Sequence, residues 1–340
     1  MVLPAAPTRH EQGITLADIV AAAERIKGAV RRTPLLPLIA SDGRNLCVLK
    51  LETLQSTGAF KFRGAFNAVA ALCEQGPVRG VTAASTGNHA IGVARAARIL
   101  GVPAVIVMPR NAPKVKREAV LTERAELTLV DGSTDELNEA ATTLAAQRNF
   151  VFVSSYDNPL VVAGQGTIGL ELVEQLDELV LRGETVGGTP IVLVPLGGGG
   201  LASGVAIAVK ALVPGSVVLG VEPETLAKGK ESLASGRLVA WPDEQLERTA
   251  ADGLRVSTLG GLPWRILRAR LDGVLTVSEA SIAHAMRVAA FSAHVVLEPA
   301  GAVALAACLA HPQSTEPVVC IASGGNVDPE RFFTLAQSAE

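Results

Sequence analysis

The sequence predicts an α/β protein built around buried parallel strands. Short apolar runs of strand length, rich in β-branched residues, occur at 47–51, 102–108, 125–130, 151–154, 191–195, 217–221 and 318–322. Alanine-rich segments with helical periodicity separate most of these runs, and glycine-rich turns follow several of them. Because a helix commonly carries the chain back between parallel strands, this alternation predicts a parallel sheet covered by helices.

The first helix is marked by its N-terminal cap. Thr15 has the residue type of an N-cap, with Asp18 three residues on, and Ile19, Ala22 and Ile26 share one apolar face. We therefore expect a helix that begins directly after Thr15.

A run of glycines, GGGGL at 197–201, joins the strand at 191–195 to a helical segment at 202–212. Glycines let the backbone approach an anion closely, and the N-terminus of the helix offers free N–H groups. The alternative is a tight turn without a ligand. We expect this loop to bind a phosphate group.

Two nucleotide-binding motifs fail at this loop. In G-x-G-x-x-G, Gly198 and Gly200 would be followed by a third glycine, but Ser203 stands there. A P-loop would need a lysine where Val205 stands. Glu222 stands at the end of the next strand, where dinucleotide-binding folds have an acidic residue. A dinucleotide-dependent oxidoreductase therefore remains an alternative.

Two further loops occupy the same position at strand ends. STGNH at 85–89 precedes a helical run at 90–100, and SGGN at 323–326 follows the strand at 318–322. Ligands of open α/β sheets bind where the carboxyl ends of strands and the N-termini of helices converge. The three loops are therefore predicted to form one site.

Composition limits the partners. The chain has 340 residues, 49% of them hydrophobic, which suffices for one large or two medium domains. Its 30 basic and 33 acidic residues give a net charge of -3, and aromatic residues make up only 3%. Neither nucleic acid nor an anionic membrane is favoured as a partner. A small molecule is expected.

The cysteines predict neither zinc binding nor disulfides. Cys47, Cys73, Cys308 and Cys320 form no C-x-x-C pair and no compact spacing with the five histidines. Residues 1–13 carry no apolar signal core, and no stretch reaches the roughly 18 apolar residues of a spanning helix. We expect reduced core cysteines and a cytoplasmic protein.

Together with KLETLQSTGAFKFRGA at 50–65, these loops resemble the serine/threonine dehydratase family of fold type II pyridoxal phosphate enzymes. The match extends in order from RTPL at 32–35 through AGQGT at 163–167 and EPAGA at 298–302 to SGGN at 323–326. The resemblance implies a tryptophan synthase beta-like fold, with two open parallel-sheet domains and the cofactor in the cleft between them. Residues 1–72 and 157–340 would form the large cofactor-binding domain and residues 73–156 the small substrate-loop domain. It also implies a homodimer.

The resemblance implies pyridoxal 5'-phosphate as cofactor, with Lys61 as the Schiff-base lysine. The implied cofactor-binding residues are Phe60, Lys61, Asn88, Gly197, Gly198, Gly199, Gly200, Leu201 and Ser323, and the implied substrate-binding residues are Ser85, Thr86, Gly87, Asn88 and His89. Such a lysine needs a depressed pKa, which apolar neighbours and the cationic Arg63 would favour. Ser323 would face the pyridine nitrogen and, unlike an aspartate, need not keep it protonated, which favours elimination.

The implied reaction is α,β-elimination from an L-β-hydroxy amino acid, threonine, serine or a bulkier one such as phenylserine, to a 2-oxo acid and ammonia. Lys61 would remove the α-proton as general base. A β-replacement enzyme, an amino-acid racemase and a non-catalytic regulator that binds the same cofactor remain alternatives.

Three positions depart from the family pattern. Ala59 stands where relatives usually have serine, which predicts a less polar pocket, and Thr86 stands where racemases use a serine as acid or base, so racemisation is not expected. In many relatives a glutamate and an acidic residue six positions later form a divalent-cation site. Glu222 is present here, but Lys228 stands at the second position. A protonated lysine cannot ligate a metal, so no metal is expected. We hypothesise that Lys228 replaces the cation, pairing with Glu222 or reaching the cofactor phosphate.

Overall fold

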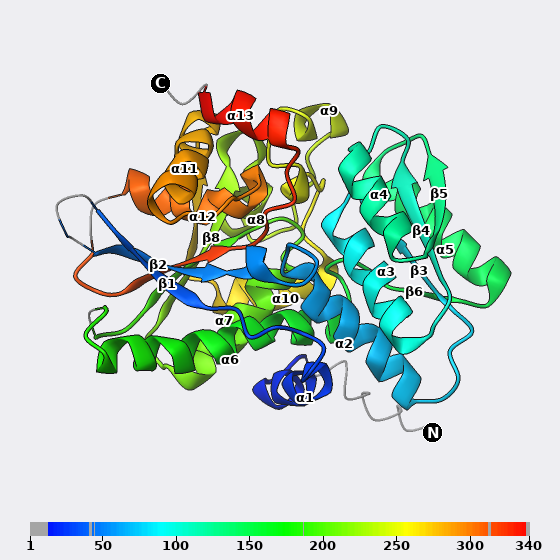
Figure 1. The fold of residues 1–340 in the computed structure, drawn as a ribbon, viewed down its shortest axis with the longest axis horizontal. Coiled ribbons are helices and arrows are strands. Elements are labelled where there is room, and N and C mark those ends of the chain that lie inside the picture. Colours follow the sequence, from blue (N-terminus) through cyan, green and yellow to red (C-terminus); the bar gives the residue numbers. More distant parts are fainter. Residues whose placement is uncertain (1–12, 41–42, 44, 186, 312–313, 338–340) are drawn as a thin grey trace.

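The computed structural model describes residues 13–40, 43, 45–185, 187–311 and 314–337. They form two α/β units that lie side by side, each with its own sheet (Figure 1). The larger sheet consists of β1 (Leu35–Ile39), β2 (Asn45–Leu51), β7 (Ile191–Pro195), β8 (Val217–Pro223), β9 (Gly273–Val277) and β10 (Val318–Ala322). Its strand order is β1-β2-β10-β7-β8-β9.

The smaller sheet consists of β3 (Val81–Ala84), β4 (Ala104–Pro109), β5 (Glu126–Val130) and β6 (Val151–Phe152), in the order β5-β4-β3-β6. Among the described strands, every neighbouring pair is parallel except β1 and β2. A short loop joins these two strands, which suits antiparallel pairing, whereas a parallel pair would need a longer crossover. The predicted α/β class with parallel sheets is confirmed.

Helices cover the faces of both sheets (Figure 1). The helices are α1 (Leu16–Ile26), α2 (Lys61–Glu74), α3 (Asn88–Leu100), α4 (Lys114–Thr122), α5 (Thr134–Arg148), α6 (Pro159–Leu181), α7 (Gly200–Leu212), α8 (Lys228–Ser235), α9 (Asp243–Leu246), α10 (Gly261–Arg270), α11 (Glu279–Ser292), α12 (Pro299–Ala310) and α13 (Pro329–Gln337). The predicted cap of α1 is confirmed, because Thr15 Oγ1 accepts from Asp18 N and the Asp18 carboxylate accepts from Thr15 N. Helix α2 contacts both α3 and α6 and so connects the two units.

Glycines let α2, α6 and α7 pack at backbone contact. A Cβ on Gly204 of α7 would lie 2.5 Å from the backbone nitrogen of Gly166 in α6. A Cβ on Gly164 would lie 2.6 Å from the Cα of Gly64 in α2. Side chains larger than hydrogen would push these helices apart. This close packing fixes the N-termini of α2 and α7 relative to each other.

A buried ionic network joins β2, α2 and α6. The Arg63 guanidinium donates to both carboxylate oxygens of Glu52, at 2.8 Å each, and to both oxygens of Glu171, at 2.7 and 2.8 Å. Lys50 donates to the same Glu171 at 2.7 Å. The side chains of Arg63, Glu52 and Lys50 are fully buried. Although burial favours the neutral acid, Arg63 keeps the pKa of Glu52 below its usual value.

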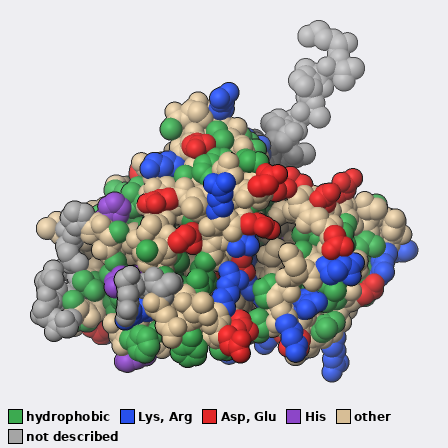
Figure 2. Space-filling view, turned by 90° about the horizontal axis from the view of Figure 1, so that it is seen from above, with side chains coloured by type: hydrophobic (Ala, Val, Ile, Leu, Met, Phe, Trp, Pro, Cys, Tyr) green, Lys and Arg blue, Asp and Glu red, His purple; other side chains and the backbone are tan. Residues whose placement is uncertain are grey.

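The surface carries both signs of charge. Figure 2 shows Lys and Arg side chains interspersed with Asp and Glu side chains over the face in view, as the net charge of -3 suggests. No helix of the described residues combines the length and apolar character needed to cross a membrane. Residues 1–12, on which the expected lack of a signal segment depends, lie outside the described part of the chain.

Candidate active site

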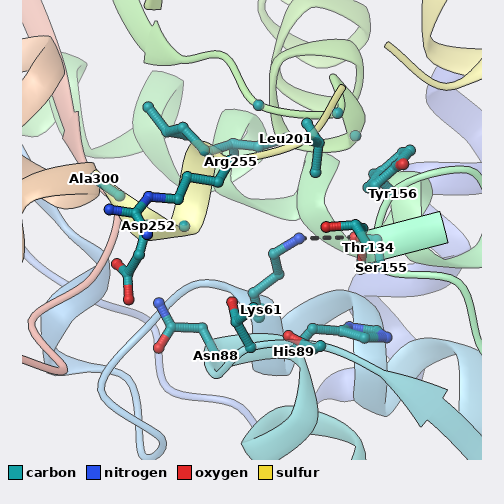
Figure 3. Close-up of a pocket in the computed structure, with 18 of the residues that line it drawn as sticks. Lys61, Asn88, His89, Thr134, Ser155, Tyr156, Leu201, Asp252, Arg255 and Ala300 are labelled. Carbon is teal, nitrogen blue, oxygen red and sulfur yellow. Dashed lines mark hydrogen bonds between the residues drawn. The ribbon is translucent and has the colours of Figure 1, made fainter. Parts of the chain in front are cut away.

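A pocket opens where strand ends and helix N-termini of both units meet (Figure 3). Its lining includes Phe60, Lys61, Ser85, Thr86, Asn88, His89, Lys116, Thr134, Asn138, Ser155, Tyr156, Gly197, Gly198, Gly199, Gly200, Leu201, Asp252, Arg255, Glu298, Ala300 and Ser323. The three loops expected to share one site therefore do so, following β3, β7 and β10. Gly87 is buried within the first of them.

Lys61 is the first residue of α2 and extends into the pocket (Figure 3). Its ammonium donates to the Ser155 carbonyl at 2.8 Å and lies 5.2 Å from the centroid of the Phe60 ring. Burial lowers the pKa of Lys61 to about 8. The expected help from Arg63 is not found, because that guanidinium points into the ionic network with Glu52 and Glu171.

The glycine loop forms a cradle at the start of α7. Gly199 adopts φ +94°, a left-handed conformation that favours glycine. A Cβ on Gly198 would overlap the ring of Tyr156, so this glycine cannot carry a side chain without moving that ring. No hydrogen bond within the described part of the chain uses the N–H groups of Gly197, Gly198 or Gly199. The first N–H groups of α7 are likewise free of partners inside the helix.

The loop between β3 and α3 supplies the opposite wall. Ser85 Oγ accepts from the Gly87 N–H at 3.1 Å, and Thr86 lines the pocket beside them. The buried His89 lies 2.8 Å from the Val153 carbonyl through Nε2, which therefore carries the proton. Burial, helped by the nearby Lys61 charge, lowers the pKa of His89 to about 3, so the imidazole is neutral at physiological pH.

Asn88 connects the two sides of the pocket. Its amide donates to Glu298 Oε1, and its carbonyl oxygen accepts from Asn326 at 2.8 Å. Asn326 also donates to the Thr57 carbonyl at 2.8 Å. This chain links the start of α3 to the segments before α2, before α12 and after β10.

A second charged group borders the pocket beside Asn88. Lys116 forms a 2.7 Å ion pair with Asp252, and its ammonium lies 3.8 Å from the buried Glu298 carboxylate. Burial raises the pKa of Glu298 to about 7. Although burial favours a neutral amine, Glu298 and Asp252 raise the pKa of Lys116. Lys116 is therefore charged, and its ion pair with Asp252 balances that charge.

Ser323 follows β10 at the bottom of the pocket. The hydroxyl donates to the Ala300 carbonyl at 3.4 Å, and the Ser323 carbonyl accepts from Phe60 N at 3.0 Å. Ala59 is fully buried and bridges to Gly324, so it does not line the pocket and does not change its polarity directly.

The structure places Lys228 away from the pocket lining. Its ammonium lies 3.3 Å from Glu222 Oε1, and both side chains are fully buried. The same Oε1 accepts from Gly229 N at 2.9 Å, and Oε2 accepts from Lys230 N at 3.0 Å. The partner of Glu222 is thus an ammonium, which cannot ligate a metal, so this arrangement does not fit a divalent metal. Of the two roles hypothesised for Lys228, the geometry supports pairing with Glu222 and gives no support to a contact with the cofactor phosphate.

Several pocket residues carry no signal in the sequence. Lys116, Tyr156, Asp252 and Arg255 come from loops or helix starts without a glycine motif, and only their spatial convergence identifies them. Glu298 lies within the EPAGA motif, which by itself suggests no role for the carboxylate. The role of Asp252 as a counterion depends on its contact with Lys116, which only the structure shows.

The pocket fits pyridoxal 5'-phosphate. The unpartnered N–H groups at 197–199 and the α7 N-terminus suit the phosphate, and Lys61 offers an amine of lowered pKa. The buried Ser323 hydroxyl can face the ring nitrogen, and Asn88 can face the ring hydroxyl. The fold and the site together define a pyridoxal-phosphate-dependent enzyme.

Comparison with known proteins agrees. Residues 26–324 match the family described as "Pyridoxal-phosphate dependent enzyme". The chain is 41% identical to L-threonine ammonia-lyase from Thermotoga maritima, over 93% of this chain and 76% of that protein. It is 38% identical to L-threo-3-hydroxyaspartate ammonia-lyase from Saccharomyces cerevisiae, over 96% and 97%. The solved structure of maize serine racemase is 35% identical, with a TM-score of 0.85 over 95% of this chain and 96% of that one. The chain belongs to the serine/threonine dehydratase family of fold type II pyridoxal phosphate enzymes.

Proposed function

We propose that this enzyme is an ammonia-lyase that eliminates water from an L-β-hydroxy amino acid with an acidic side chain, such as threo-3-hydroxyaspartate. The products would be a 2-oxo acid and ammonia. The observation that carries this substrate class is Arg255, a cation in the pocket lining whose hydrogen bonds within the described residues all go to backbone carbonyls.

Arg255 is held by neutral groups. Its Nε and Nη2 donate to the Thr249 carbonyl at 3.1 and 2.6 Å, and Nη2 also reaches the Glu247 carbonyl at 3.5 Å. No ion pair or Nη1 hydrogen bond of Arg255 is found with the described residues. In Figure 3 the guanidinium points away from Leu201 of the phosphate loop and toward Asp252. Since Asp252 is paired with Lys116, Arg255 can receive a substrate carboxylate.

The chain's own groups have distinct tasks in this reaction. The bound cofactor supplies electron withdrawal from the substrate α-carbon. The Lys61 amine, whose lowered pKa makes the neutral form more accessible, takes the α-proton. The N–H groups of the 85–89 loop receive the α-carboxylate, and the neutral His89 adds no charge beside it.

Threonine is the second candidate substrate, because the chain is similar to an L-threonine ammonia-lyase over 93% of its length. Phenylserine finds less support in the pocket. Trp264 is 9% exposed within the core and Phe291 is 72% exposed on the surface, and neither lines the pocket.

Racemisation needs an acid or base on the second face of the substrate, where Thr86 offers a hydroxyl of restricted rotamer.

Replacing Arg255 by glutamine tests the substrate class. We expect kcat/KM for L-threo-3-hydroxyaspartate to fall by about 100-fold, because a charge-assisted hydrogen bond is lost, while kcat/KM for L-threonine changes little. Release of 2-oxo acid measures both. The exposed Arg265 on α10 provides the matched control, Arg265→Gln, which should alter neither value. Equal losses for both substrates would show that Arg255 does not bind the substrate side chain, and would not contradict the proposed elimination reaction.

The pKa of Lys61 predicts the pH dependence of cofactor loading. Only the neutral amine attacks the cofactor aldehyde, and at pH 7 it is about one-tenth of the total. We expect the loading rate of the cofactor-free protein to rise about tenfold per pH unit up to about pH 8 and then to level off. Stopped-flow absorbance after mixing with pyridoxal phosphate measures this rate. A midpoint near 10 would show that the pocket does not depress this pKa.

A further inference from the structure

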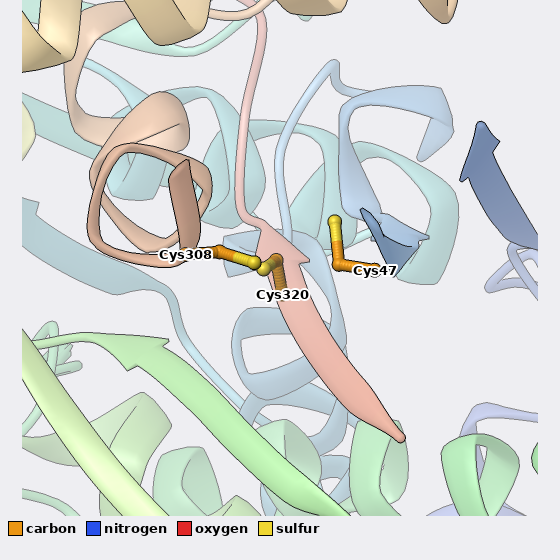
Figure 4. A group of neighbouring side chains, drawn as sticks. All are labelled: Cys47, Cys308 and Cys320. Carbon is orange, nitrogen blue, oxygen red and sulfur yellow. The ribbon is translucent and has the colours of Figure 1, made fainter. Parts of the chain in front are cut away.

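Three of the four cysteines meet inside the larger unit (Figure 4). Cys47 belongs to β2, Cys320 to β10 and Cys308 to α12. Their three Sγ atoms all lie within 4.8 Å of one another. None of these residues lines the pocket described above.

Strand register explains this convergence. Strands β2 and β10 are parallel neighbours, with Cys320 paired to Leu49. Cys47 stands two residues before Leu49 and therefore shares its face of the sheet. Helix α12 packs on that face within the same core cluster and contributes Cys308. Because the three residues are far apart in the sequence, their spacing does not reveal the cluster.

The thiols are close enough for shared coordination. Ligands at the usual zinc–sulfur distance of about 2.3 Å lie roughly 3.8 Å apart around a tetrahedral ion. Movement of the sulfurs by less than about 1 Å would therefore bring these three into a coordination sphere.

The third thiol faces a backbone carbonyl. Cys308 Sγ donates to the Leu46 carbonyl at 3.7 Å, so this thiol carries its proton until a cation replaces it. Cys308 is also the half-buried member, which provides a path from solvent, with His311 three residues further on at the exposed end of α12.

We propose that Cys47, Cys308 and Cys320 form a binding site for one thiophilic d10 cation, such as Cd²⁺ or Zn²⁺. Binding replaces the thiol protons of all three cysteines, which are released to solvent, and no oxidation occurs. The ion would tie together β2, β10 and α12. Cys320 lies three residues before Ser323, so the ion would brace the strand that carries a cofactor-binding position.

Cadmium titration of the reduced holoenzyme tests this site, with the sulfur-to-cadmium charge-transfer absorbance as readout. We expect one equivalent bound per chain. Cys320→Ala and Cys308→Ala should each raise the Kd by at least about 100-fold, because a ligand of the ion is removed. Cys73 lies on α2 outside the cluster and supplies the matched control, Cys73→Ala, with an unchanged Kd.

A second readout separates binding from a folding defect. Cd²⁺ should raise the Tm of the wild type and of Cys73→Ala by mass action, and should leave the Tm of Cys308→Ala unchanged. Cys308 is the half-buried member, so its truncation is the mildest of the three. A Kd that is the same in the wild type and in Cys308→Ala, or the absence of a charge-transfer band in the fully reduced protein, would overturn the proposal and leave the cluster as core packing.

Discussion

Replacing Lys61 by alanine is expected to lower 2-oxo acid release by at least about 1,000-fold. The Lys61 amine is the general base assigned to the α-proton, and it is also the group that would bind the cofactor covalently. The Ser155 carbonyl, which accepts the hydrogen bond of this amine, has no basicity to replace it. Turnover of L-threo-3-hydroxyaspartate and L-threonine under saturating cofactor measures the effect.

The control for this experiment is another lysine outside the pocket. Lys27 is 76% exposed at its side chain, so Lys27→Ala should keep wild-type turnover. The visible spectrum of the bound cofactor should change in Lys61→Ala and stay unchanged in Lys27→Ala. Turnover of Lys61→Ala within tenfold of the wild type would place the general base elsewhere.

Replacing Arg63 by leucine is expected to reduce the free energy of unfolding by about 3–5 kcal/mol. The change removes the cation shared by Glu52 and Glu171 and leaves the fully buried Glu52 carboxylate without its partner. Of these two acids, Lys50 forms an ion pair with Glu171 and not with Glu52. Urea denaturation followed by circular dichroism measures the difference.

An exposed ion pair provides the comparison. Arg110 and Asp131 are 62% and 78% exposed at their side chains and 3.2 Å apart. Arg110→Leu should cost no more than about 1 kcal/mol, because water and salt screen such a pair. If Arg63→Leu proved equally mild, the buried network would contribute orientation of α2 and little net stability.

Much of the fold could be predicted from the sequence. The strands at 191–195 and 318–322 coincide with β7 and β10, because continuous apolar runs bounded by turns identify buried strands. Strands β1, β3 and β9 were not predicted. Strand β3, whose sequence is VTAA, has too little apolar periodicity to distinguish a strand from a helix. Strands β1 and β9 lie at the two edges of the larger sheet and are mostly half-buried, so their apolar pattern is weaker.

The site was predictable where a backbone motif marks it. The glycine loop and the 85–89 loop follow strands, and their position alone suggests a common site. Lys61 depended on the family resemblance, because a single lysine beside aromatic residues has no distinguishing pattern. Arg255 and Asp252 could not be predicted, since their roles depend on neighbours far away in the sequence. The same reason hides the cysteine cluster.

The helices that start at the pocket have an electrostatic consequence. Helices α2, α3, α7 and α12 begin at Lys61, Asn88, Gly200 and Pro299, within or beside the pocket lining. Each N-terminus carries a partial charge of roughly +0.5, so the backbone itself makes this region positive. The chain as a whole has a net charge of -3. Anions are thus attracted by a fixed local field rather than by surplus surface charge, and dissolved salt screens such a field in a recessed site only weakly.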